Sequence, residues 1–483
     1  MNGSQEHQLE AIARQAMRAH GFEPDFSPAA KAQANAGIVH SGGAAVRDLR
    51  DLPWSSIDND DSRDLDQIEV CSSDGGRTRV LVGIADVDVV VTKGSPVDEH
   101  ARTNTTSVYT PAVIFPMLPT ALSTDRTSLN QDQDRHAIVI DMIVGPEGTV
   151  TGAEIYRAMV RNKAQLAYPS VAAWLEGSGP APAPLSTLRG LDEQLRQQDE
   201  IAQRLRRERE ECGALDFDRT ELKAVVDESG VRELRAETTN RARLLIENFM
   251  VAANGAVARF LSGRGLPSIR RVVREPERWP RIVDLAAQRG GRLPAQPDPV
   301  ALQQFLKTQR DSAPDTFADL SLAIIKLLGR GEYVAAAPGD ASLHFALATE
   351  SYSHSTAPNR RYPDVLTQRL VKAALAGNAA PYALAELSAL ARHCTEQEDA
   401  ANKVERLTKK AAAALWLADR IGQTFDAIVT GAGPKGTWVR MSGMPVEGRL
   451  ERGAQGLDVG DRVRVRLIST DPARGFIDFA RAS

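Results

Sequence analysis

The sequence has little of several features that define whole classes of protein. Only three of its 483 residues are cysteine, namely Cys71, Cys212 and Cys394. An odd and scattered set of cysteines forms neither a disulfide framework nor a zinc site, and it is typical of a reducing cytoplasm. The first residues, "MNGSQEHQLE", have neither a basic segment nor an apolar one, so we expect no signal peptide. No apolar run looks long enough to span a bilayer, so we expect no membrane partner.

An excess of charge of one sign is also missing. The formal net charge is −4 at pH 7, which argues weakly against a nucleic-acid partner. The sequence contains no internal repeat and no sustained heptad, which excludes solenoids and long coiled coils. What remains is the composition of an ordinary globular chain, long enough for two to four domains.

The first part of the chain reads as a small helical unit. Residues 5–20 have apolar side chains at helical spacing, and Gly21 is placed to end this helix. Ser27 and Pro28 are placed to begin a second, shorter helix. Two short helices are compatible with a helix-turn-helix, although this evidence is weak.

The residue pattern changes from about Leu52. Runs such as "RVLVGIADVDVVV" and "HAIVIDMIV" are β-branched and nearly continuous, which predicts buried strands. Residues 191–210 are highly charged and predict a solvent-exposed helix. Residues 238–261 are apolar almost all round and predict a buried helix.

The last sixty residues alternate apolar and polar side chains between Gly, Pro and Asp turns. This pattern predicts about five short strands in a small closed barrel such as an OB-fold. Basic side chains are interleaved with aromatic ones there, a combination that suits single-stranded nucleic acid. The alternative is that most of the aromatic rings are barrel core. The residues are Lys435, Arg440, Arg449, Arg462, Arg464 and Arg466, with Phe425, Trp438, Phe476 and Phe479.

Five aspartates crowd into residues 58–66, "DNDDSRDLD". Asp58, Asp64 and Asp66 lie between two strand-like segments at a spacing that can present oxygen ligands to Mg²⁺ together with substrate phosphates. Asp60 and Asp61 face other directions of the loop. The spacing does not fit a calcium EF-hand. The alternative is a solvated turn without a ligand.

Two further stretches carry chemistry. Arg360 and Arg361 stand just before a helix that we expect to begin at Pro363, and a helix N-terminus with guanidinium groups is a natural phosphate site. Surface arginines in a capping loop are the alternative. Glu247 lies inside the apolar helix, where a buried carboxylate needs a partner, and a salt bridge to a neighbouring arginine would provide one. Tyr109 and Tyr168 are by themselves no more than packing candidates.

Four motifs in order resemble the RNB catalytic domain of the ribonuclease II/ribonuclease R family. They are "IDNDDSRDLDQ", "SVYTPAVIFPMLPTALSTDRTSLN", "LLIENFMVAAN" and "STAPNRRYPDVLTQRL", and the resemblance covers roughly residues 50–380. The final barrel is similar to the S-one-type RNA-binding domain that follows RNB in this family. The resemblance implies a processive 3′→5′ exoribonuclease that hydrolyses single-stranded RNA to nucleoside 5′-monophosphates.

The resemblance also implies roles for individual residues. Asp58 and Asp64 would hold Mg²⁺, for which Mn²⁺ can substitute, and Asp66 would organise metal and attacking water. Arg360 would stabilise the phosphate and its transition-state charge. The remaining candidates would contact RNA: Glu247 at the 3′-terminal nucleotide, Tyr109 against the terminal bases, Tyr168 in setting the product length, and Arg361, Tyr352 and His354 along the channel.

Two departures from the family stand out. The fourth aspartate of the motif is Gln67 here, which can ligate a cation but brings no charge, so we expect an altered metal site rather than a dead one. The family usually begins with two cold-shock barrels, whereas about fifty helical residues precede the motif here. Fewer clamps at the channel mouth would let structured RNA approach more closely.

Three rival readings remain at this point. The chain could be an inactive RNB-type RNA-binding protein, a metal-dependent phosphodiesterase acting on DNA or small nucleotides, or a purely structural protein. The second is disfavoured by Glu247, Tyr109 and the barrel, and the third leaves the ordered motifs unexplained. We expect a monomer in the cytoplasm.

The predicted fold class is α+β with several domains. We expect a small helical unit at 1–45, an RNB catalytic domain with a mixed sheet, buried helices and trailing helices at 46–420, and a five-stranded OB-fold at 421–483.

Overall fold

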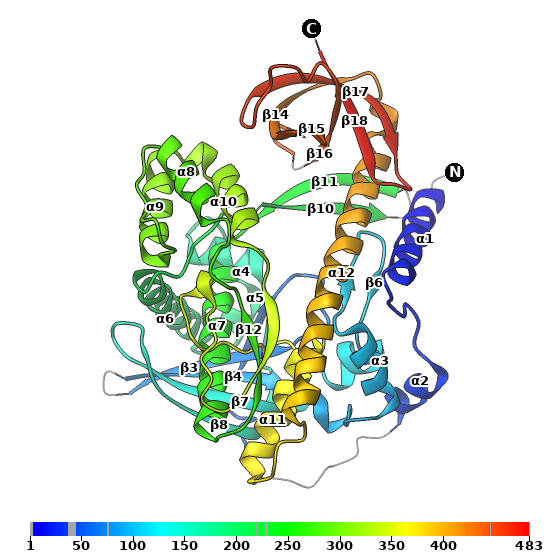
Figure 1. Ribbon diagram of the computed structural model, residues 1–483. Helices are drawn as coiled ribbons and strands as arrows, with labels where there is room; N and C mark the ends of the chain where they lie inside the picture. The colour runs from blue at the N-terminus through cyan, green and yellow to red at the C-terminus, as the bar shows by residue number, and fades with distance from the viewer. Residues whose placement is uncertain are drawn as a thin grey trace.

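A computed structural model describes residues 3–36, 45–74, 77–218, 220–227, 230–444 and 446–482. It has three parts (Figure 1): a sheet covered by helices, a helical layer that runs up from it along α12, and a barrel at the C-terminal end. This arrangement agrees with the predicted α+β fold. The five short C-terminal strands and the mixed sheet are both present.

The sheet of the body has the strand order β1-β8-β7-β4-β3-β2-β9. The pairs from β8 to β2 are antiparallel, whereas β1 with β8 and β2 with β9 are parallel. Its central strands are the predicted apolar runs, and they are buried because helices cover them. The bounds are β1 (Val46–Asp48), β2 (Ser55–Asp58), β3 (Gln67–Asp74), β4 (Arg77–Ala85), β7 (Asp134–Val144), β8 (Val150–Arg161) and β9 (Ala164–Ala167).

Helix α7 (Arg241–Gly263) is the core helix of the body. It begins where the Asn240 side chain accepts a hydrogen bond from Arg243 N at 2.9 Å, and it buries Leu245, Phe249 and Val257. By length and composition it is apolar enough to cross a membrane, which corrects the expectation that no run is long enough. More than half of that apolar window, 56%, is buried inside the protein, as in a core helix.

Helix α6 (Leu191–Glu211) is not the solvent-exposed helix that its charge predicts. One face buries Leu191, Leu195 and Leu205 and packs against α7 and β3. Most of the charged residues occupy the remaining faces, and the buried Asp199 is paired with Arg241 of α7. A pattern of leucines spaced by helical turns outweighs the overall charge, because burial is decided face by face.

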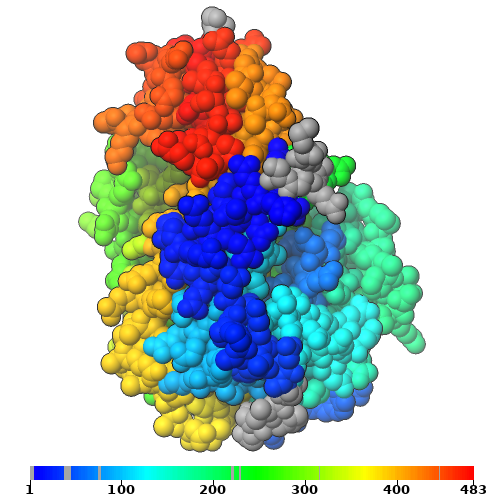
Figure 2. All heavy atoms as spheres, turned by 90° about the vertical axis from the view of Figure 1, so that its right-hand side faces the viewer, coloured from blue at the N-terminus to red at the C-terminus, as the bar shows by residue number. Residues whose placement is uncertain are grey.

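Helix α12 (Leu384–Leu417) connects the body to the barrel and also supports the N-terminus. Helix α1 (Gly3–Ala19) packs on it, with Leu9 against Ala411 and Leu415. Helix α2 (Pro28–Asn35) is capped by Ser27 as predicted and packs instead on α3 (Pro96–Asn104). In Figure 2 these blue helices lie on the surface below the barrel. Since each packs on a different partner, the helix-turn-helix expectation gains no support.

The remaining elements form the layer beside α12 and the connections around the sheet. Helices α8, α9 and α10 share a second apolar core, and the β10–β11 pair contacts α12. The bounds are β5 (Val108–Tyr109), β6 (Ile114–Phe115), α4 (Tyr168–Leu175), α5 (Ala183–Thr187), β10 (Thr220–Asp227), β11 (Gly230–Thr238), β12 (Ser268–Val272), α8 (Trp279–Gln288), α9 (Pro299–Ser312), α10 (Pro314–Leu328), β13 (Glu332–Ala336), α11 (Tyr362–Ala376), and the short helices η1 (Val87–Val89), η2 (Leu122–Arg126), η3 (Phe345–Leu347) and η4 (Ala418–Arg420).

The barrel closes in the order β14-β15-β16-β18-β17. Its strands are β14 (Thr424–Gly433), β15 (Gly436–Met441), β16 (Glu447–Arg452), β17 (Arg462–Asp471) and β18 (Phe476–Arg481). Strand β17 alternates as the sequence predicts: Val463, Val465 and Leu467 are buried, while the arginines between them are exposed. Phe479 is core, as the alternative reading expects, whereas Phe476 is 46% exposed, so its ring is accessible at the surface.

Candidate active site

The aspartates of the loop between β2 and β3 differ in burial. Asp58 ends β2 and is buried, and Asp66 is only 1% exposed. Asp64 is half-buried between them. Asp60 and Asp61 are exposed, as the sequence suggests. We call Asp58, Asp64 and Asp66 the acid cluster.

Asp66 connects the acid cluster to residues 359–361, which we call the arginine motif. Its Oδ1 accepts a hydrogen bond from Asn359 N at 2.9 Å, and Arg360 Nε lies 3.3 Å from its Oδ2. Burial raises the pKa of Asp66 to about 7, and the Arg360 charge opposes that rise. The pair therefore joins a buried carboxylate to a guanidinium that is 42% exposed and accessible to a ligand.

Tyrosines flank the acid cluster on both sides. The Tyr109 hydroxyl donates to Asp64 Oδ2 at 3.3 Å, and burial raises the pKa of Asp64. On the other side Arg243 lies over the Tyr168 ring, 5.3 Å from its centroid, and donates to Asn59. Tyr109 and Tyr168 thus lie at the cluster, where aromatic faces can meet a nucleotide.

Asp58 is oriented by its own loop. Its Oδ1 accepts hydrogen bonds from Asn59 N at 2.7 Å and from the Ser62 hydroxyl at 2.8 Å. These bonds fix the carboxylate. They also explain why a serine stands within the acidic run.

The two guanidinium groups of the arginine motif have different partners. Helix α11 begins at Tyr362, one residue before the expected Pro363. Arg361 is bound to Asp364 of the same helix by two hydrogen bonds of 2.7 and 2.9 Å. Only Arg360 is directed to the acid cluster, so the two neighbours are not equivalent phosphate ligands.

The surroundings of three other candidate residues could not be predicted from the sequence. Glu247 is exposed, which corrects the expectation that it is buried and needs a salt bridge. Tyr352 is buried and accepts a hydrogen bond from Asn254, while His354 shares a hydrogen bond of 2.8 Å with Tyr333. Tyr352 and His354 therefore pack behind the arginine motif.

The residues of the acid cluster fit a divalent cation that keeps part of its water shell. Among the described residues, no group of three or more His, Cys, Asp or Glu side chains stands ready to enclose a metal ion. Mg²⁺ does not require one, since it keeps several waters and takes one or two carboxylates together with phosphate oxygens. In the described part of the chain Asp66 Oδ2 receives no hydrogen bond, nor does either oxygen of the buried Glu69. The unpartnered Glu69 oxygens, and Asp66 Oδ2 in its ion pair with Arg360, are carboxylate oxygens of the kind that a hard cation takes.

Sequence reasoning missed two residues of this region, Glu69 and Arg243. Glu69 follows Gln67 by two positions on β3, and side chains two apart share a strand face. The alternation of the strand could therefore have pointed to it. Arg243 had no such signal, because it reaches the loop from α7.

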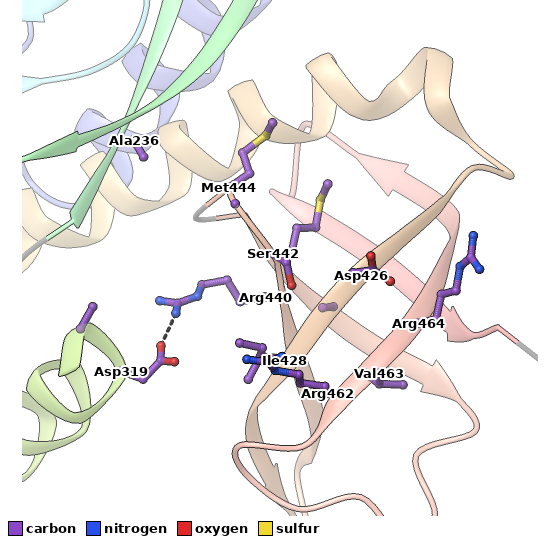
Figure 3. Close-up of a pocket in the computed structure, with 14 residues that line it drawn as sticks. Ala236, Asp319, Asp426, Ile428, Arg440, Ser442, Met444, Arg462, Val463 and Arg464 are labelled. Carbon is purple, nitrogen blue, oxygen red and sulfur yellow. Dashed lines mark hydrogen bonds and ion pairs between the residues drawn. The ribbon is translucent and has the colours of Figure 1, made fainter. Parts of the chain in front are cut away.

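A groove separates the barrel from the helical layer (Figure 3). Its cavity of about 730 Å³ is lined by β14, β15 and β17 of the barrel and by α10 and β11, and we call it the barrel groove. Arg440 crosses it to form an ion pair with Asp319 of α10. Arg462 and Arg464 line the barrel side. A second cavity of about 580 Å³ shares Arg440 and extends the groove to Arg271.

Comparison with known protein families gives two matches. Residues 46–377 match the RNB domain, and residues 423–482 match the RNase II-type exonuclease C-terminal S1 domain. Ribonuclease R of Escherichia coli is 30% identical over 97% of the chain, and ribonuclease R of Aquifex aeolicus is 29% identical over 90%. The chain spans 62% and 64% of these relatives, respectively, which is less than two thirds of their length.

Solved structures share the fold at lower identity. Mycoplasma genitalium RNase R in complex with ribose methylated single-stranded RNA superimposes with a TM-score of 0.87 at 21% identity, covering 98% of this chain and 78% of that one. Yeast Ssd1, described as a pseudonuclease, gives 0.70 at 15% identity, covering 91% of this chain and 55% of that one.

Proposed function

The chain belongs to the RNB family, and from this premise we propose that it is a Mg²⁺-dependent 3′→5′ exoribonuclease. Its substrate would be single-stranded RNA and its products nucleoside 5′-monophosphates. The observation that carries the proposal is the juxtaposition of Arg360 with Asp66 beside two further aspartates. Hydrolysis of a phosphodiester needs this combination, because negative charge develops on the phosphate oxygens while a water molecule must be positioned.

The reaction is an in-line displacement at the last phosphodiester. Water adds to phosphorus, the bond from phosphorus to the 3′-oxygen breaks, and the 3′-oxygen leaves with a proton. Mg²⁺ or Mn²⁺ held by Asp58, Asp64, Asp66 and Gln67 would supply Lewis-acid stabilisation of the phosphate oxygens. Asp66 would orient the attacking water. Arg360 would donate its remaining N–H groups to the phosphate as charge develops.

The remaining residues would hold the RNA. Tyr109 and Tyr168 offer aromatic faces next to the acid cluster, and stacking on such faces accepts every base. Glu247 is exposed and can accept hydrogen bonds from the sugar hydroxyls of the 3′-terminal nucleotide, which would favour RNA over DNA. The channel would also be supported by residues that pack around the arginine motif, namely Arg361, Tyr352 and His354. We further propose that the protein acts as a cytoplasmic monomer.

A second candidate function is RNA binding without hydrolysis. Gln67 favours it, because the uncharged amide removes one negative charge from the metal site. This candidate predicts intact RNA at any Mg²⁺ or Mn²⁺ concentration.

The test is a time course on 5′-labelled single-stranded RNA with Mg²⁺, beside EDTA and the variants Asp66→Asn and Asp61→Asn. We expect a ladder that collapses to a short labelled core, that EDTA abolishes, and that Asp66→Asn loses while the exposed control Asp61→Asn keeps it. RNA that stays intact while a gel shift shows binding would favour the second candidate.

A further inference from the structure

Glu69 is a buried carboxylate that nothing in its described surroundings satisfies. Its side chain is 0% exposed, and neither Oε1 nor Oε2 has a hydrogen-bond partner. The hydroxyl of Ser55, which pairs with Glu69 across β2 and β3, is buried and without a partner as well. An unpaired buried carboxylate is very costly, so a chain that keeps three orphaned oxygens together must satisfy them in another way.

The position of Glu69 connects these oxygens to the acid cluster. Gln67 and Glu69 alternate onto one face of β3, and paired residues of neighbouring strands also share a face, which adds Ser55. Strand β3 begins at Gln67, directly after Asp66 of the acid cluster. The orphaned oxygens therefore lie on the face of β3 that Gln67 shares, near the end of the strand that adjoins the cluster.

Among the residues that the structure describes, none forms an ion pair with Glu69. Burial, and after it the negative charge of Asp58, raises the pKa of Glu69 well above its ordinary value. Arg243 and Arg360, the two arginines of the site, are engaged with Asn59 and Asp66. Three oxygen atoms and no cationic side chain form an environment suited to a hard divalent cation, which takes oxygen ligands.

We propose that Glu69 is a ligand of the divalent cation at the acid cluster and supplies the carboxylate that Gln67 does not. The inference rests on the proposed function, since it assigns a ligand within that same site. It makes Gln67 and Glu69 a coupled pair: the charge missing at the first position of β3 is present two residues further along the same face. In the altered motif the fourth carboxylate is then moved from position 67 to position 69, and the total charge of the site is preserved.

The test measures cation binding directly, without RNA. Mn²⁺ is titrated into the full-length protein, and free Mn²⁺ is followed by its EPR signal for the wild type, Glu69→Gln and the exposed control Asp61→Asn. We expect Glu69→Gln to weaken Mn²⁺ binding about tenfold or more, whereas Asp61→Asn binds as the wild type does. Thermal unfolding without metal verifies folding, and Glu69→Gln should melt no lower than the wild type because it removes an orphaned charge.

A swap variant tests the coupling. Gln67→Asp combined with Glu69→Val moves the carboxylate to the other position, and we expect Mn²⁺ affinity within a few-fold of the wild type, while Glu69→Val alone stays weak. Wild-type affinity in Glu69→Gln would overturn the inference, as would a wild type that binds no Mn²⁺. Both outcomes are independent of the RNA time course, which alone decides the exoribonuclease activity.

Discussion

Arg360 and Arg361 are neighbours in the chain, yet their surroundings give them different tasks. Arg361 makes two hydrogen bonds to Asp364 and is therefore part of the start of α11. Arg360 pairs with Asp66 through Nε and also interacts with the Tyr109 hydroxyl, so its guanidinium faces the acid cluster, where a ligand would bind. A planar fork of this kind suits a phosphate better than a point charge does.

Replacing Arg360 by lysine tests this difference at the residue scale. We expect the rate of hydrolysis of bound RNA to fall about 10²- to 10³-fold, because one ammonium cannot serve Asp66 and the phosphate together. Single-turnover kinetics with excess protein measure the rate. The same change at the exposed Arg392 of α12 should leave it unaltered. An unchanged rate in Arg360→Lys would remove Arg360 from the chemistry.

At the element scale, the position of the arginine motif depends on how α11 is held. Arg369 is the buried centre of that attachment, with 4% of its side chain exposed. It donates to Asp88 and Asp98, both at 2.8 Å, and to the Tyr382 hydroxyl. These contacts join α11 to η1 and α3, so they fix the helix that presents Arg360.

Removal of Arg369 should therefore destabilise the whole body. We expect Arg369→Met to lower the free energy of unfolding by about 3–5 kcal/mol, because the buried carboxylate of Asp98 would be left without its cation, whereas Asp88 keeps its ion pair with Lys372. Urea denaturation followed by circular dichroism measures the loss. The exposed control Arg392→Met should change it by less than about 0.5 kcal/mol. A loss below about 1 kcal/mol would mean that the surrounding groups rearrange to replace Arg369.

At the scale of the whole molecule, the barrel groove lies away from the acid cluster, and on the proposed function we expect its exposed arginines to contact the phosphates of an RNA strand. Arg462 and Arg464 are exposed on this surface, and Arg440 is held by Asp319. Contacts to phosphates there would raise affinity without taking part in hydrolysis. Binding and chemistry would then be separable by mutation.

The double change Arg462→Gln and Arg464→Gln tests that separation. We expect weaker RNA binding and a shallower salt dependence, by about 0.7 in the slope of log K against log salt for each phosphate that is no longer neutralised. The single-turnover rate at saturating protein should stay the same. Fluorescence anisotropy at several salt concentrations measures binding, with the exposed Arg189→Gln as control. An unaltered slope would exclude these two arginines from the RNA interface.

Stability of the whole molecule should also depend on pH through His344. Burial, and after it the charge of Arg271, lowers the pKa of His344 from 6.5 to about 4. Between these values the unfolded chain binds the proton and the folded protein does not, so stability is full above pH 6.5 and is lost as the pH falls toward 4. The Nδ1 atom accepts a hydrogen bond from Leu347 N, which asparagine can replace.

We therefore expect His344→Asn to lose less stability than the wild type when the pH falls from 7 to 5. The comparison with the variant is needed because Asp66 works in the opposite sense: burial raises its pKa to about 7, so its protonation favours the folded state as the pH falls. Melting temperatures at both pH values measure the difference. Equal losses in the two proteins would show that His344 is not the responsible group.

Most of the local structure follows from the sequence by itself. Side chains a few positions apart determine these features, because periodicity acts over that range. The features are the buried strands, the α7 core helix, the Ser27 cap and the alternation of β17. The spacing of Asp58, Asp64 and Asp66 belongs to the same class, because one loop carries all three. The four ordered motifs identified the family for the same reason.

Only the tertiary structure decided which of these groups meet and which are satisfied. Asn359 and Asp66 are 293 positions apart, and no local pattern reports that they bind each other. The exposure of Glu247, the buried face of α6 and the pairing of Arg361 also depend on what packs against each face. Glu69 is the clearest example, because only the packed core shows that its carboxylate has no partner among the described residues.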